Sequence, residues 1–143
     1  MIIAFIVVLI LVLLTLKEPK EFVQARENYE ILLNHVRKEP SVPKKFHVLK
    51  KRILISGFKN PFNYGALGYN INKGTEIGLC VQGDSNQIFH VLLHELAHST
   101  VEEYSHNEEF WKNFRELCSL CERLGIYKPI NTSTKFCGKY IRD

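Results

Sequence analysis

The sequence contains no internal repeat, no low-complexity segment and, after its first 16 residues, no long hydrophobic run. These absences exclude a repeat array, a disordered or collagen-like chain and a polytopic membrane transporter. At 143 residues, the chain is also too short for a multidomain enzyme, because one compact domain commonly takes about 100 to 200 residues. We therefore expect one small domain over residues 17–143.

Cysteine is scarce and unevenly spaced, at positions 80, 118, 121 and 137. Four such cysteines do not suggest the disulfide framework of a small secreted domain, so we expect free thiols. Cys118 and Cys121 form a CxxC pair inside a helical pattern, but there is no second pair to complete a structural zinc site. We expect both to be buried on a helix face.

The first 16 residues carry no charge, and Thr15 is their only polar side chain. As a helix they would rise about 24 Å, slightly less than the hydrocarbon core of about 30 Å, and Lys17 and Lys20 could reach the headgroups. A basic start and a small-residue cleavage site are both missing. We therefore expect an uncleaved membrane anchor over 1–16, rather than a signal peptide or a buried core helix.

Membrane orientation follows from the flanking charges. Lys17, Lys20 and Arg26 all follow the hydrophobic segment, so the positive-inside rule predicts that the domain lies on the cytoplasmic side of a cellular or viral membrane. Free cysteines would agree with this orientation.

The formal net charge of +4 is only mildly basic. One basic cluster consists of Lys44, Lys45, His47, Lys50, Lys51 and Arg52. Such a cluster could bind phosphates, a membrane surface or an acidic substrate, but a solvated strand face is the simpler interpretation.

Hydrophobic spacing before residue 82 predicts one helix and a small β region. Three- and four-residue spacing favours a helix over 20–38. Partly alternating residues favour one or two strands over 45–58. Two short apolar runs, 66–71 and 75–81, flank turn residues and predict a β-hairpin.

Two helices and a tail are expected after the hairpin. Asp84 can cap a helix that runs to about residue 103, with Gln87 completing the capping box. A second helix over 107–124 carries a broad apolar face and is closed by Gly125. The tail from residue 127 is expected to be irregular and to dock through Ile130, Phe136 and Tyr140.

The motif His94-Glu95-Leu96-Ala97-His98 lies within the first of these helices. Residues four apart share one helix face, so both imidazoles can bind one zinc ion at about 2.0–2.1 Å. Glu95 would then lie beside the metal, where a carboxylate can act as the general base towards water.

A catalytic zinc site needs a third protein ligand and an open fourth position. His106 is the main candidate, since a turn after residue 103 could bring it back to the motif. Glu109 or Glu116 is the alternative, because other HExxH enzymes use a downstream carboxylate. His90 lies one turn before His94, which favours a supporting or buried role over direct ligation.

These residues resemble the small zincin metallopeptidases of the SprT-like and WLM group. The HELAH motif, His106 and Phe110 four positions later carry the resemblance. The His106-to-Trp111 HNxxFW segment and the late Phe136-Cys137-Gly138 element are most similar to short WLM-like proteins of large DNA viruses.

The resemblance implies an α+β fold of the minimal zincin type. This fold has a small mixed β-sheet whose edge strand can align a peptide, an HExxH helix and a second packed helix. It also implies that His94, His98 and His106 bind one zinc ion per chain and that Glu95 is the general base.

We therefore hypothesise a membrane-anchored zinc metallopeptidase that hydrolyses peptide bonds of a protein or peptide substrate. The hairpin within 66–81 would bind substrate by strand addition. The second oxyanion donor is left open among Tyr64, Tyr69, Tyr104 and Tyr127. The alternatives are a catalytically inactive, zinc-stabilised scaffold of a viral membrane or DNA-associated complex, and a peptidase that binds nucleic acid through 44–52.

Overall fold

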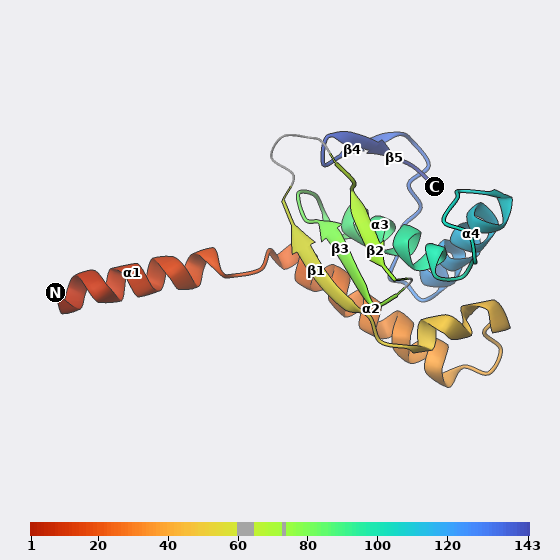
Figure 1. Cartoon of the computed structure of the whole chain (residues 1–143), viewed down its shortest axis with the longest axis horizontal. Coiled ribbons are helices and arrows are strands. Elements are labelled where there is room, and N and C mark those ends of the chain that lie inside the picture. The colour runs from red at the N-terminus through yellow and green to blue at the C-terminus, as the bar shows by residue number, and fades with distance from the viewer. Residues whose placement is uncertain (60–64, 73) are drawn as a thin grey trace.

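Three strands form a mixed sheet in the computed structural model, which describes residues 1–59, 65–72 and 74–143. The strands are β1 (Leu54–Phe58), β2 (Gly68–Ile71) and β3 (Glu76–Cys80), in the order β1-β3-β2. β1 runs parallel to β3 and β2 antiparallel to it, as the predicted hairpin requires. β2 is therefore an edge strand. Figure 1 shows α2 and α3 behind the sheet.

The helices pack around this sheet and share one hydrophobic core. They are α2 (Lys20–Lys38), α3 (Ser85–His98) and α4 (Glu108–Arg123), with α3 in contact with α2, α4, β2 and β3. The core includes the fully buried rings of Phe22, Phe46, Phe89, Phe110, Phe114 and Phe136. The α+β class with a small mixed sheet and two packed helices is thus confirmed.

Helix α3 begins as expected but ends early. Asp84 accepts a hydrogen bond from the Gln87 main-chain N–H at 2.8 Å, and the Gln87 side chain accepts from the Asp84 main chain, which confirms the capping box. The helix stops at His98 rather than near 103. Thr100 Oγ1 donates to the Ala97 carbonyl at 2.7 Å, and such local side-chain bonds compete with further helical turns.

Two other elements differ from the expectation. Residues Lys44–Lys50 form a 3₁₀ helix, η1, so 45–58 holds one strand only. The tail is not irregular, because β4 (Thr134–Phe136) and β5 (Lys139–Ile141) form an antiparallel hairpin. Its two turn residues, Cys137 and Gly138, both have positive φ, which matches the tight turns that join paired strands. Ile130 and Phe136 are buried as expected, whereas Tyr140 is 70% exposed.

The expectation of four free thiols was wrong for one pair. Cys80 at the end of β3 and Cys137 at the tail turn form a disulfide that links residues 57 apart in the sequence. The wide separation of the two cysteines in the sequence gives no sign of this contact, which arises because the tail hairpin folds back onto the sheet. The free-thiol argument for the cytoplasmic side therefore does not apply to this pair. Cys118 and Cys121 are free and buried on α4, as expected.

Residues Ile2–Thr15 form the helix α1, which projects away from the rest of the protein (Figure 1). None of its residues is buried, so it is not a core helix. Within the described residues, no single helix has the length and hydropathy of a membrane span, and α1 passes this test only together with α2, from which it is bent by 49°. At 14 residues, α1 rises about 21 Å. The predicted anchor over 1–16 is thus not supported by this test.

Candidate metal centre

Three histidines converge where α3 meets the loop that precedes α4. His94 and His98 lie one turn apart on α3, and the loop after α3 returns His106 to the same point. His106 Nε2 lies 3.0 Å from His94 Nε2 and 3.1 Å from His98 Nε2. One ligand atom from each residue falls within 4.8 Å of the other two. The structure thus brings together all three predicted ligands.

This nitrogen triangle fits a small divalent cation. A tetrahedral zinc ion with Zn–N bonds of about 2.0–2.1 Å requires ligand nitrogens about 3.3 Å apart, close to the spacing in the structure. Burial, with His98 and His106 nearby, lowers the pKa of His94 to about 3. His94 is therefore neutral at physiological pH, and neutral imidazole is the form that binds metals.

The alternative ligands lie elsewhere. The Glu116 carboxylate pairs with Lys45 Nζ at 2.6 Å on another part of the surface. No carboxylate joins the histidine cluster among the residues that the structure describes, which leaves Glu109 out as well. His90 Nδ1 lies 2.8 Å from the Tyr127 hydroxyl and 3.2 Å from an Asp143 carboxylate oxygen. His90 therefore belongs to a neighbouring buried network.

Aromatic rings of α4 support the three imidazoles. The Phe110 ring centre lies 4.5 Å from that of His98 and 4.9 Å from those of His94 and His106. Trp111 lies 5.7 Å from His106 and 5.9 Å from His94. These contacts restrict the ring orientations, which explains why an aromatic pair follows His106 so closely in the sequence.

Glu95 lies beside the histidines and lines the same cavity. It is only 8% exposed, and burial raises its pKa to about 7. A carboxylate with a pKa in this range can accept a proton and return it near neutral pH. Its position also depends on β2: a Cβ on Gly68 would lie 2.8 Å from Val91 Cγ1 and 3.2 Å from Glu95 Cγ.

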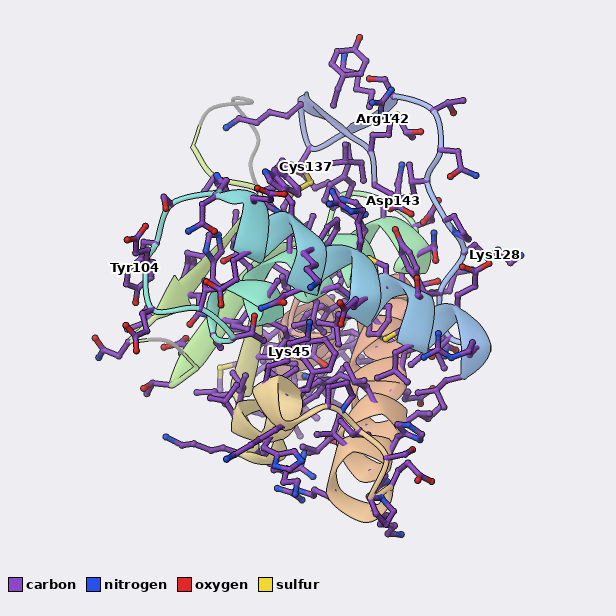
Figure 2. All side chains as sticks on the ribbon, turned by 90° about the vertical axis from the view of Figure 1, so that its right-hand side faces the viewer. Lys45, Tyr104, Lys128, Cys137, Arg142 and Asp143 are labelled. Atoms are coloured by element: carbon purple, nitrogen blue, oxygen red, sulfur yellow. A yellow bond between two sulfur atoms is a disulfide. The ribbon has the colours of Figure 1, made fainter. Side chains whose placement is uncertain are left out.

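The histidines and Glu95 face a cavity of about 500 Å³. One wall is formed by Gly68 and Asn70 of the edge strand β2 with Leu67 just before it, and another by β5 with Arg142 just after it. Figure 2 looks onto α4, with Tyr104 on the loop at the left and Arg142 near the top. The sequence analysis did not assign the tail hairpin to the site, because the tail reaches the cavity only once the chain is folded.

The four tyrosines considered as oxyanion donors occupy different places. Tyr104 lines the cavity, with its ring centre 6.3 Å from that of His98. Tyr69 stacks on Phe58, and Tyr127 is buried with His90. Tyr64 lies outside the described residues. Tyr140, not considered from the sequence, also lines the cavity.

The family model of the WLM domain matches residues 52–141. The chain belongs to the WLM domain family. This match covers the whole sheet, the HExxH helix, α4 and the tail hairpin, but neither α1 nor α2.

Relatives of this WLM chain include a viral protein. An uncharacterized protein of Acanthamoeba polyphaga mimivirus is 36% identical over an 85-residue alignment, which covers 52% of this chain and 43% of the viral protein. The match thus spans less than half of that relative. Two crystal structures of Wss1 from S. pombe, one of them a mutant, share 24% identity and a TM-score of 0.43. They cover 61% and 63% of this chain, and 79% and 77% of the Wss1 chains.

The family match confirms the resemblance to the WLM group, and the mimivirus relative confirms the similarity to WLM-like proteins of large DNA viruses. WLM domains form a zincin-like, zinc-dependent metalloprotease family. The histidine triad of this chain could bind a metal.

Proposed function

We propose that this WLM chain is a zinc-dependent peptidase. The observation that carries the proposal is the convergence of three imidazole Nε2 atoms beside the buried Glu95 carboxylate, in a cavity bordered by an edge strand. His94, His98 and His106 would hold the metal. A zinc ion bound there supplies Lewis-acid activation of water and of the scissile carbonyl.

Glu95 is the proton carrier in this proposal. Its carboxylate accepts a proton from the attacking water and delivers it to the amine nitrogen that leaves. Its low exposure keeps bulk water from competing for that proton. Tyr104 is the proposed donor to the oxyanion, because it lines the cavity and its ring lies near that of His98, whereas Tyr69 and Tyr127 do not line the cavity.

The edge strand β2 is the proposed substrate platform. β3 pairs with one edge of β2, and Gly68 and Asn70 of β2 line the cavity. An extended peptide can add to such an edge through main-chain hydrogen bonds. The nearby Glu95 and histidines would then lie against one peptide bond of that strand.

The test compares wild type with Glu95→Gln on an unstructured protein substrate. The variant keeps the side-chain size and the histidines, so we expect it to retain zinc and to lose hydrolysis. Full activity in Glu95→Gln would contradict the mechanism. A zinc-loaded wild type that cleaves neither proteins nor a broad peptide library would favour the inactive zinc-stabilised scaffold instead.

We also propose that residues 1–16 attach the protein to a membrane. Every large hydrophobic side chain of α1 is at least 45% exposed, and such a surface favours apolar surroundings. The full chain should float with phosphatidylcholine vesicles, and Leu9→Lys with Leu13→Lys should abolish flotation. Recovery of the wild type in the aqueous fraction would contradict this proposal.

A further inference from the structure

The cavity that contains Glu95 has a basic wall. Lys139 of β5 and Arg142 just after it line the cavity, and both are exposed. Glu95 is the one carboxylate in the cavity lining, as far as the structure describes the chain. In the proposed reaction, Glu95 carries the proton and does not bind an ionic group of the substrate. An anionic group entering the cavity would therefore meet two positive charges near the reacting centre.

These two charges are available to a ligand. Some exposed cations are held by carboxylates of the chain itself: Arg26 pairs with Glu18, and Arg52 pairs with Glu30. Across residues 1–59, 65–72 and 74–143, no ion pair involves Lys139 or Arg142. A carboxylate arriving on a substrate would displace water but no internal partner.

The basic wall is fixed to the protein at several points. The Cys80–Cys137 disulfide holds the hairpin turn at the end of β3. Phe136 lies against Gly83, where a Cβ would be 2.3 Å from the ring. Figure 1 shows β4 and β5 across one end of the sheet.

The residue after Arg142 is anchored as well. The Asp143 carboxylate accepts hydrogen bonds from the Tyr127 hydroxyl and from the Ile130 main-chain N–H. Lys139 and Arg142 thus lie on a segment held at both ends, and side chains on a rigid element select ligands better than side chains on a free tail.

We propose that Lys139 and Arg142 form a specificity site that binds an acidic side chain of the peptide substrate. The inference rests on the proposed peptidase function and names its substrate class. A peptide extended along β2 would enter the cavity that Lys139 and Arg142 also line, so a Glu or Asp side chain near the scissile bond would meet the basic wall. Exposed ion pairs stabilise modestly, so selectivity rather than tight binding is expected.

The experiment measures peptide binding without turnover. The full-length Glu95→Gln chain, loaded with zinc, is titrated with two labelled peptides of otherwise identical sequence. The acidic peptide has Glu at several positions, and the neutral peptide has Gln at the same positions. We expect the acidic peptide to bind about three- to tenfold more tightly at low salt. The double variant Lys139→Glu with Arg142→Glu should lose or reverse this preference. Because the binding measurement needs no hydrolysis, a failure of the proposed specificity can be distinguished from a failure of the proposed catalysis.

A matched control separates the wall from the net charge. Lys128→Glu with Lys135→Glu changes the charge equally on exposed residues outside the cavity lining, and it should keep the preference. Equal binding of both peptides, or equal loss in both double variants, would overturn the proposal. A DNA oligonucleotide that displaces the peptide and itself needs Lys139 and Arg142 would also overturn it, in favour of a phosphate-binding wall.

Discussion

The side-chain amide of Asn70 donates a hydrogen bond to the main-chain carbonyl of Glu95 at 2.8 Å. The same amide donates to Ser99 Oγ at 3.0 Å, and Asn70 Oδ1 accepts from the Gly74 N–H at 2.7 Å. One residue of the edge strand therefore holds the backbone of the proposed general base. This bond couples the place where substrate would bind to the place where the proton would move.

Asn70→Ala should reduce both stability and hydrolysis. The substitution leaves a partly buried carbonyl of α3 without this donor, which costs about 1–3 kcal/mol in the free energy of unfolding. Urea denaturation and kcat/KM on one peptide measure the two effects. Asn70→Asp keeps an acceptor for Gly74 but not the donor to Glu95, so it should lower kcat/KM as well. Normal kinetics in both variants would show that this bond does not position Glu95.

Tyr104→Phe should lower kcat by about 10²–10³-fold if Tyr104 donates to the oxyanion. The zinc content should not change, because the ligands are untouched. Tyr140→Phe is the matched control, since Tyr140 lines the same cavity but has no ring contact with the histidines among the described residues. A larger kcat loss in Tyr140→Phe than in Tyr104→Phe would assign the role to Tyr140.

The buried His90 should make the protein sensitive to acid. Burial lowers the pKa of His90, although Asp143 opposes this shift. Below the unfolded value of about 6.5, the unfolded chain takes up a proton that the folded chain refuses, so the free energy of unfolding falls as the pH falls. Between about pH 7 and 5, the free energy of unfolding measured in urea should therefore fall more steeply for the wild type than for His90→Asn, whose side chain does not titrate. Identical slopes would mean that His90 does not contribute.

The disulfide should stabilise the fold by restricting the unfolded chain. For residues 57 apart, the loop-closure estimate is about 4 kcal/mol, and measured values are commonly about 2–4 kcal/mol. Cys80→Ser with Cys137→Ser should lower the free energy of unfolding by this amount in urea denaturation. Adding a phosphine reductant should destabilise the wild type and leave the double variant unchanged. A wild type that is insensitive to the reductant would contradict the linkage.

Local patterns predicted the parts of this structure that depend on neighbouring residues. The capping box of α3 and the β2–β3 hairpin follow from such short-range signals. The four-residue spacing of His94 and His98 likewise sets both imidazoles on one helix face.

Long-range contacts could not be read from the sequence in the same way. The Cys80–Cys137 disulfide, the bond from Asn70 to Glu95 and the wall with Lys139 each join residues far apart in the chain. No spacing rule encodes such contacts, because they exist only after the tail folds onto the sheet and β2 approaches α3.

Zinc content, measured by elemental analysis of the purified full-length chain, tests the central claim most directly. We predict about one zinc per folded wild-type chain and per Glu95→Gln chain, and loss of most of that zinc in His98→Ala. A folded wild type that holds no zinc after loading and removal of excess metal would contradict the account, because the three histidines would then not form a metal centre.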